Sequence, residues 1–369
     1  MSNLHARAVV SVADPEPIIA AVCAHLCEYD TDIRYDGGAH RIRYDFGSGS
    51  LRALPEAIEL EAEASDISGL YHMRMALAAH VKECAGAPSP EIVWVGDGDD
   101  IETPPNFRPV SVRKVRDITP HMRRITFAGE DLERFADEEN LHVGLIIPPE
   151  GGELVWPKVG RDGLLKWDPD KPAPALRRYT VRSYDRAAET LDIDFVLHED
   201  AGPGAAFARR AQPGLAAGLA GPFGGSIVRG RDWYLLAGDE TALPAISRFL
   251  EILPAGTPGR ALIEIAGPQD EQPIGGGAIK VEWIYRGEDR PGLRLSEAVR
   301  ATELPFDAAR PHSNSPHSNS PYVWAACEFN AFKAIRNHLR TERGVKKQDH
   351  LVVAYWRQGE LVDRAPGND

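Results

Sequence analysis

The spacing of hydrophobic residues along the chain changes twice, and these changes separate three stretches of different character. In residues 1–97, one segment repeats apolar residues at every fourth position, at Ile18, Val22 and Leu26, while its neighbours alternate apolar and polar residues. The first spacing is typical of an amphipathic helix and the second of half-buried strands. These residues therefore predict a small α+β domain, followed by a linker rich in Asp, Gly and Pro over residues 98–109.

Residues 110–228 contain short segments of alternating polarity separated by turn-forming residues. This pattern predicts an antiparallel β-barrel. One connection inside it, Pro149–Pro174, is much longer than the others. Loops of that length in a compact domain are often functional.

Residues 229–369 switch to apolar strands that alternate with helices, which predicts an α/β domain with a parallel, doubly wound sheet. Ligands of such sheets lie at the carboxyl ends of the strands. The residues expected there are Gly238–Ala242, Gly267–Pro268 and Cys327–Glu328. The chain is thus expected to have several domains.

Composition narrows the class of protein. With 43% hydrophobic and 26% charged residues, the chain is typical of a soluble globular protein. Its net charge of -13 argues against a general nucleic-acid or anionic-membrane binder, and no apolar run reaches the length of a membrane span. The cysteines are scattered without a metal-binding set, so we expect no protein-bound metal and a reducing cytoplasm.

The segment from Arg177 to Tyr184 alternates arginines with aromatic and β-branched residues and is predicted to be a strand. On a strand, one face would carry Arg178, Thr180 and Arg182, and the other Tyr179 and Val181. An aromatic ring, a hydroxyl and fixed cations suit a flat, anionic ligand such as a flavin dinucleotide.

A second candidate site follows, where a strand passes through a Gly/Pro turn into a short helix. Backbone N–H groups at a helix start carry partial positive charge and can hold a pyrophosphate. The residues concerned are His198, Gly202, Pro203 and Gly204.

The segment Arg178–Arg182 resembles the Arg-x-Tyr-Thr-x-Arg flavin box of the siderophore-interacting protein family. Members of that family are NAD(P)H-dependent ferric-siderophore reductases of the ferredoxin-reductase superfamily. The string from Gly238 to Ile246 and the segment Tyr322–Glu328 resemble that family's nicotinamide domain, and the resemblance covers roughly residues 107 to 358. The chain departs from the family at Glu199, Gly204 and Phe207, and it has Cys327 where glycine is usual. Residues 1–97 resemble a small domain of unknown function that is sometimes fused to such reductases.

The resemblance implies roles for the candidate residues. Tyr179 would stack on the isoalloxazine of FAD and Thr180 would reach its N5 edge. Phosphates or the ribityl chain would be held by Arg178, Arg182, His198, Gly202, Pro203 and Gly204. The nicotinamide side would be lined by Asp239, Glu240, Thr241, Ala242, Cys327 and Glu328, with Arg286 and Arg290 as candidates for a 2′-phosphate of NADPH.

The expected chemistry is a relay from NADPH or NADH through FAD to a ferric siderophore. Iron arrives chelated, so the protein needs no metal ligands of its own. Two alternatives remain open: a flavin reductase of another acceptor, such as a free ferric chelate, a quinone or a ferredoxin, and a non-catalytic flavin-binding or iron-sensing module.

Charge for substrate docking is expected on the long loop. Many family members have a lysine where this chain has Gly144, so Lys158, Arg161 and Lys166 are the candidate substitutes. The alternative is that these three are ordinary solvated side chains.

Histidines outside these motifs have simpler interpretations. His25, His72 and His80 could be metal ligands, although helix-surface or hydrogen-bonded histidines are the preferred interpretation. The duplicated His312–Pro316 and His317–Pro321 is expected to be a disordered loop rather than a metal site.

Overall fold

The computed structural model of the 369-residue chain describes residues 3–27, 31–136, 140–152, 154–198, 202–224, 227–275, 277–305 and 321–359. Contacts divide the chain into two compact units. The first unit combines the residues up to Phe107 with Pro149–Ala173, and the second combines Arg108–Pro148 with the residues from Pro174 onward. The duplicated histidine segment, apart from Pro321, lies outside the described residues.

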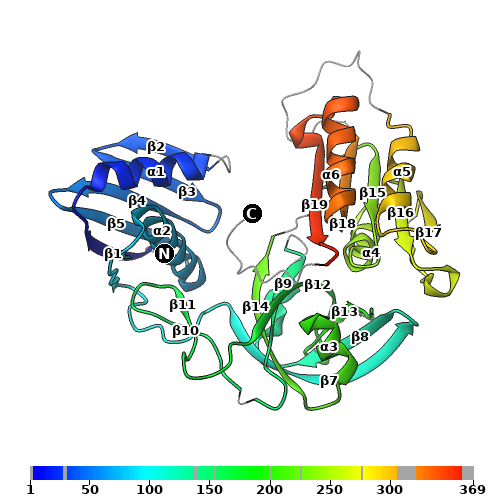
Figure 1. The fold of residues 1–369 in the computed structure, drawn as a ribbon, viewed down its shortest axis with the longest axis horizontal. Coiled ribbons are helices and arrows are strands. Elements are labelled where there is room, and N and C mark those ends of the chain that lie inside the picture. The colour runs from blue at the N-terminus through cyan, green and yellow to red at the C-terminus, as the bar shows by residue number, and fades with distance from the viewer. Residues whose placement is uncertain are drawn as a thin grey trace. The chain divides into compact units, whose positions relative to one another are not determined.

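The first unit contains a six-stranded sheet of order β2-β3-β4-β5-β1-β6 (Figure 1). Inward side chains of the strands share one hydrophobic cluster with both helices, so α1 and α2 cover the same face. The elements are β1 (Leu4–Ser11), α1 (Pro15–Cys27), β2 (Asp32–Asp36), β3 (Ala39–Tyr44), β4 (Gly47–Leu54), β5 (Ala57–Ala64), α2 (Ile67–Ala85) and β6 (Val95–Gly96).

Strand β4 was not predicted, because its glycines and serines are uncommon in strands. The structure explains them by the close approach of α2. A Cβ atom on Gly47 would lie 2.8 Å from the Met73 side chain, and one on Gly49 would lie 2.8 Å from Leu77. Only a residue without a side chain lets the helix pack this close to the sheet.

The long loop packs on this first unit and contains a short hairpin, β10 (Lys158–Val159) and β11 (Leu165–Lys166). Asp162 anchors it. Its carboxylate lies 2.6 Å from Lys82 Nζ on α2 and 3.1 Å from Lys166 Nζ, and its backbone carbonyl accepts a 3.0 Å hydrogen bond from Trp94 Nε1. Because Asp162 is buried, these bonds fix the loop to the α+β domain.

The second unit begins with a closed barrel of order β12-β13-β8-β7-β14-β9. The barrel interior is filled by aliphatic residues and by the rings of Phe127, Phe195 and Phe207, the last contributed by the short helix α3. Its elements are β7 (Phe107–Thr119), β8 (Met122–Ala128), a 3-10 turn (Leu132–Phe135), β9 (His142–Ile147), β12 (Ala175–Asp185), β13 (Thr190–Val196), α3 (Pro203–Arg210) and β14 (Ala216–Phe223).

A five-stranded parallel sheet of order β17-β16-β15-β18-β19 completes this unit (Figure 1). Alternate residues of its central strands enter two clusters, one with α4 and the other with α5 and α6, so helices cover both faces. The elements are β15 (Tyr234–Gly238), α4 (Leu243–Ile252), β16 (Gly259–Ile265), a 3-10 turn (Pro268–Asp270), β17 (Ile279–Tyr285), α5 (Leu293–Ala301), β18 (Tyr322–Glu328), α6 (Phe329–Asn337), a π-helical turn (His338–Glu342), a 3-10 turn (Lys347–Asp349) and β19 (His350–Trp356).

The predicted fold class is confirmed in all three parts: an α+β domain, an antiparallel barrel and a parallel α/β sheet. None of the described helices combines the length and the apolar character needed to span a membrane.

Loss of the Asp162 carboxylate is expected to release the long loop. Asp162→Asn keeps the shape of the side chain but removes its two charge-assisted bonds, each worth about 1.5–3 kcal/mol when partly buried. We expect cleavage within residues 149–173 by a nonspecific protease to become roughly tenfold faster, as measured by mass spectrometry. The control is Asp168→Asn, an exposed position of the same loop. Equal cleavage rates in both variants would contradict the anchoring role.

Candidate functional site

Strand β12 carries the predicted flavin residues, and the predicted alternation of its faces is confirmed. Tyr179 and Val181 pack with the barrel core, whereas the Thr180 hydroxyl bonds to Tyr355 of the parallel sheet. The Tyr179 ring lies 4.4 Å from the Phe195 ring, between centroids. Its hydroxyl points at the first turn of α3, where a Cβ atom on Gly204 would lie 1.9 Å from Tyr179 Oη. The glycine, which departs from the family pattern, leaves room for the tyrosine hydroxyl in this position.

The arginines of β12 have different partners. Arg182 forms a bidentate ion pair with Glu251 of α4, at 2.6 and 3.0 Å, so its charge is largely neutralised. Arg178 is exposed, with its guanidinium 5.7 Å from the centre of the Phe223 ring. Burial raises the pKa of Tyr179, and the nearby charge of Arg177 opposes that rise. Arg177 is thus the cation beside Tyr179, and the two-residue period of a strand could have identified it.

The start of α3 has the properties of an anion-binding helix terminus. Gly202 is its N-cap in an extended conformation, Pro203 occupies the first turn, and no side chain among the described residues caps the helix. Within the described part of the chain, its first-turn N–H groups therefore have no intrahelical or side-chain acceptor. With Tyr179 against this turn and Arg177 nearby, the donor set fits the pyrophosphate of a dinucleotide. The predicted His198 is exposed, and its carbonyl accepts a hydrogen bond from Arg209.

A buried line of hydrogen bonds connects Thr180 to the parallel sheet. His142 Nδ1 lies 2.6 Å from the Gly224 carbonyl oxygen, which can only accept, so this nitrogen carries the proton. The neutral ring then accepts at Nε2 from Tyr355 Oη, 2.7 Å away. Tyr355 Oη in turn accepts from the Thr180 hydroxyl, and this bond opposes the rise that burial produces in the pKa of Tyr355. The donation therefore runs from Thr180 through Tyr355 and His142 to Gly224.

Asp239 lies at the carboxyl end of β15 and is fully buried. One carboxylate oxygen accepts hydrogen bonds from Thr241, whose backbone nitrogen is 3.0 Å away. The other accepts from the Glu328 backbone nitrogen at 3.1 Å and from Trp356 Nε1 at 2.8 Å. Burial and the neighbouring Glu240 raise the pKa of Asp239 to about 6. The predicted group of Asp239, Thr241 and Glu328 is thus brought together, with Trp356 as a further member.

Two other predicted members of the group are enclosed by the fold. Ala242 is fully buried at the start of α4, and Cys327 is fully buried in the cluster that contains α5 and α6. Burial raises the pKa of the Cys327 thiol, which keeps it protonated and apolar. Glu328 caps α6, where it accepts a 2.6 Å hydrogen bond from the Asn330 nitrogen.

Arg286 is held by acidic residues. Its guanidinium forms a bidentate pair with Glu240 at 2.7 and 3.0 Å and lies 3.5 Å from Glu264. Glu264 was not predicted, because a lone glutamate inside a strand gives no signal in the sequence. It is fully buried and caps α5 by accepting hydrogen bonds from the Gly292 and Leu295 nitrogens at 2.7 and 3.0 Å. Arg290, the second phosphate candidate, is exposed.

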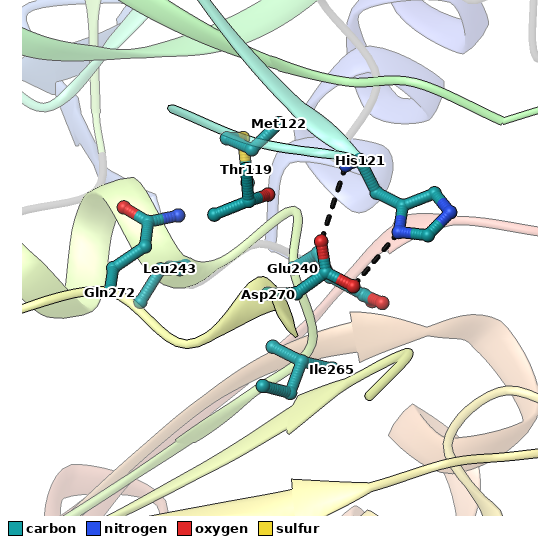
Figure 2. Close-up of a pocket in the computed structure, with 8 residues that line it drawn as sticks. All are labelled: Thr119, His121, Met122, Glu240, Leu243, Ile265, Asp270 and Gln272. Carbon is teal, nitrogen blue, oxygen red and sulfur yellow. Dashed lines mark hydrogen bonds and ion pairs between the residues drawn. The ribbon is translucent and has the colours of Figure 1, made fainter. Parts of the chain in front are cut away.

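A shallow pocket lies at the carboxyl ends of β15 and β16, where a parallel sheet binds its ligands (Figure 2). His121, in the turn between β7 and β8, donates its backbone N–H to Asp270 at 3.2 Å, and its Nδ1 lies 2.8 Å from the same carboxylate. The lining residues are Thr119, His121, Met122, Glu240, Leu243, Ile265, Asp270 and Gln272.

The three predicted docking cations belong to the first unit. Lys158 and Arg161 are exposed, whereas Lys166 is paired with Asp162 at 3.1 Å. Arg161 and Lys166 border a hollow of about 270 Å³, whose lining residues are Lys82, Glu91, Ile92, Arg161, Asp162 and Lys166. Three cations and two carboxylates leave this hollow with a small positive excess.

Acid is expected to weaken the second unit through His142. Burial lowers the pKa of His142 from 6.5 to about 4. Between these two pH values the histidine is protonated in the unfolded chain and neutral in the folded chain. Stability is therefore lost as the pH falls through this window, by about 2 kcal/mol between pH 7 and pH 5. His142→Gln retains hydrogen-bonding groups without this titration. Hydrogen exchange of peptides from β9 and β19 should show a smaller acid-induced loss of protection in the variant than in the wild type. Equal losses would contradict the buried neutral state of His142.

Two family models match the second unit and one matches the first. A siderophore-interacting FAD-binding domain matches residues 111–226, a siderophore-interacting protein matches residues 231–359, and an uncharacterized protein conserved in bacteria matches residues 7–95.

Relatives and solved structures agree with these matches. The chain is 31% identical over 246 residues to the ferric vibriobactin reductase ViuB of Vibrio cholerae, covering 66% of this chain and 86% of that protein. It is 28% identical over 256 residues to the NADPH-dependent ferric-chelate reductase of Escherichia coli, covering 68% and 92%. A siderophore utilization protein from T. fusca is 34% identical, with a TM-score of 0.56 over 70% of this chain and 96% of that one. The chain belongs to the siderophore-interacting protein family.

Proposed function

We propose that this protein is an oxidoreductase that uses bound FAD to carry electrons from NADPH or NADH to a ferric siderophore. The observation that carries this proposal is the packing of Tyr179 against the start of α3, which no described side chain caps, with Arg177 beside it. The aromatic ring, the free backbone N–H groups and the cation offer what a flavin dinucleotide needs. Relatives named as ferric reductases support the choice of acceptor class.

In this proposal the barrel residues hold the cofactor. The N–H groups of Gly204 and its neighbours would bind the pyrophosphate together with Arg177 and the exposed Arg178, and Arg182 would act mainly by joining β12 to α4. When bound, FAD accepts two electrons together and passes them on one at a time, as reduction of Fe(III) requires.

The parallel sheet would bind the electron donor at the carboxyl ends of β15, β16 and β18. Asp239 would act there as an internal brace, because both of its carboxylate oxygens already accept hydrogen bonds, from Thr241, Glu328 and Trp356. Arg286 is already paired with Glu240, so the exposed Arg290 is the better candidate for a 2′-phosphate. The four free cysteines agree with a reducing compartment, and we propose the cytoplasm.

The long loop would attract an anionic ferric siderophore. Lys158 and Arg161 are exposed, whereas Asp162 neutralises much of the charge of Lys166. We therefore assign the larger share of this attraction to Lys158 and Arg161. Exposed charges act mainly on association, so the contribution should weaken with salt.

The purified protein should show the visible spectrum of an oxidised flavin, and NADPH or NADH should bleach it without oxygen. Addition of a ferric siderophore should restore the spectrum and yield Fe(II), trapped by a ferrous chelator. Gly204→Ala should remove most of the flavin, because the new methyl group would collide with Tyr179 Oη. Gly256→Ala is the matched control, since a Cβ atom there meets no atom within 4 Å.

The outcomes separate the alternatives. A flavin-free Gly256→Ala protein, or a flavin-replete Gly204→Ala protein, would contradict the assigned flavin site. If a quinone or a free ferric chelate reoxidises the reduced flavin rapidly and ferric siderophores do not, that compound is the electron acceptor in place of a siderophore. A bound flavin that neither nucleotide reduces would indicate a non-catalytic module.

Tyr355→Phe should alter the reduction potential of the flavin. In the wild type, Thr180 donates its proton to Tyr355, so Oγ1 is left as an acceptor toward any ligand. That polarity favours a flavin with a proton at N5, the reduced form. Without the phenol, Thr180 can donate instead, and we expect the potential to fall by about 20 mV, the equivalent of one hydrogen bond of about 1 kcal/mol.

The matched control for this measurement is Tyr234→Phe, which removes a buried phenol that donates to the Val228 carbonyl in the same unit. An unchanged potential in Tyr355→Phe, or an equal shift in Tyr234→Phe, would show that the Tyr355 hydroxyl does not set the polarity of Thr180.

A further inference from the structure

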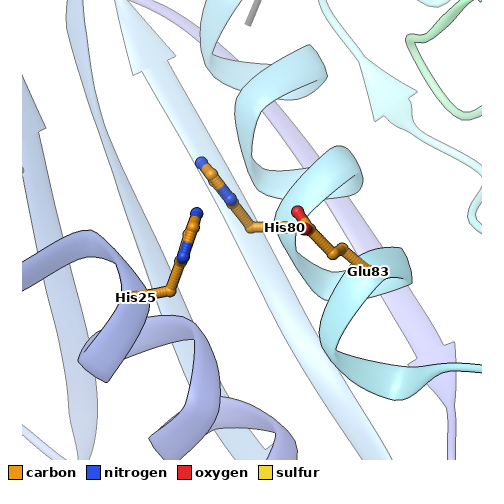
Figure 3. A group of neighbouring side chains, drawn as sticks. All are labelled: His25, His80 and Glu83. Atoms are coloured by element: carbon orange, nitrogen blue, oxygen red, sulfur yellow. The ribbon is translucent and has the colours of Figure 1, made fainter. Parts of the chain in front are cut away.

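Two histidines and a glutamate come together between the helices of the first unit (Figure 3). His25 lies near the end of α1, and His80 and Glu83 lie on α2, three residues apart and therefore on one face of that helix. One nitrogen from each imidazole and one carboxylate oxygen all lie within 4.8 Å of one another. The two rings are 5.3 Å apart between centroids and tilted by 56°.

The environment of His80 points to a missing partner. Its Nδ1 is enclosed by the protein and has no hydrogen-bond partner among the described residues. Buried ring nitrogens are normally satisfied, because leaving one unpaired in the interior is unfavourable. His72 on the same helix shows the ordinary arrangement, with its Nε2 3.1 Å from Asn106 Nδ2. The contrast separates His80 from a histidine that serves only in packing.

We propose that the first unit binds a divalent first-row transition-metal ion, Zn²⁺ or Fe²⁺, through His25, His80 and Glu83. Two imidazoles and one carboxylate are a ligand set that both ions accept, whereas Mg²⁺ and Ca²⁺ prefer oxygen ligands alone. The carboxylate also offsets part of the charge of the ion. Three protein ligands leave at least one coordination position for water or another small ligand.

The geometry requires only small adjustments. Bonds from Zn²⁺ to nitrogen are about 2.0 Å long, so two ligand atoms on one ion stand roughly 3.3 Å apart. Glu83 is exposed and both rings are half-buried, so rotation of side chains can close the group from its present spacing. Because the ligands come from both helices, a bound ion would cross-link α1 to α2. The inference does not depend on the proposed reductase activity, since no residue of the second unit takes part.

The test uses the full-length protein after removal of metal by a chelator. Calorimetric titration with Zn²⁺, and with Fe²⁺ under anaerobic conditions, should show one tight site that Mg²⁺ does not fill. Zn²⁺ should also raise the melting temperature of the first unit. Glu83→Gln and His80→Gln should each weaken binding about tenfold or more and abolish the thermal shift. The ion with the lower dissociation constant is the preferred one.

Two controls keep the result specific. His5→Gln changes an exposed histidine of β1, and a double variant, His312→Gln with His317→Gln, removes the histidines of the duplicated segment. Both should bind as the wild type does. Absence of a site in the wild type, wild-type binding by Glu83→Gln, equal filling by Mg²⁺, or loss of the site in the double variant would overturn the proposal. Glu83 is exposed, so its variant remains informative if His80→Gln fails to fold.

Discussion

Four groups of the second unit form a continuous line of hydrogen bonds, from Thr180 through Tyr355 and His142 to the Gly224 carbonyl. It joins β12 and β9 of the barrel to β19 of the parallel sheet, and each group in it has one available role. Because the Gly224 carbonyl can only accept, the proton positions along the whole line are determined from that end. These hydrogen bonds therefore connect the barrel to the parallel sheet. They also determine that the Thr180 hydroxyl on β12 acts as a donor toward Tyr355.

Negative charge is concentrated behind the carboxyl ends of the parallel strands. Asp239 and Glu264 are fully buried, and Glu240 is nearly so. Each is compensated differently: Asp239 by N–H and O–H donors, Glu264 by the start of α5, and Glu240 by Arg286. Buried carboxylates survive only with such partners. Burying these carboxylates lowers the stability of the folded protein. Such a loss is typical of ligand-binding regions, where polar groups must be held in place before the ligand arrives.

Periodicity was enough to predict the fold, since the barrel and the parallel sheet differ in the pattern of apolar residues, and this pattern is local. The failures are non-local or depend on side-chain detail. β4 was missed because the requirement for glycine at positions 47 and 49 comes from a helix later in the chain. The partnership of His142 with Tyr355 joins residues 213 positions apart, and no spacing rule predicts it. Arg177, by contrast, was predictable from the sequence, because the alternation of a strand puts it on the same face as Tyr179.

The path of the backbone through the two units has a consequence for synthesis on the ribosome. The chain begins in the first unit, builds β7, β8 and β9 of the barrel, returns to the first unit for Pro149–Ala173, and then completes the barrel. Domains usually fold in order of their appearance during translation. Here the Asp162 anchor reaches Lys82 only after three barrel strands have been made, so the first unit cannot be finished before the second has begun. At that point β7 and β8 can already pair with each other, whereas β9 still lacks both of its partners, β12 and β14.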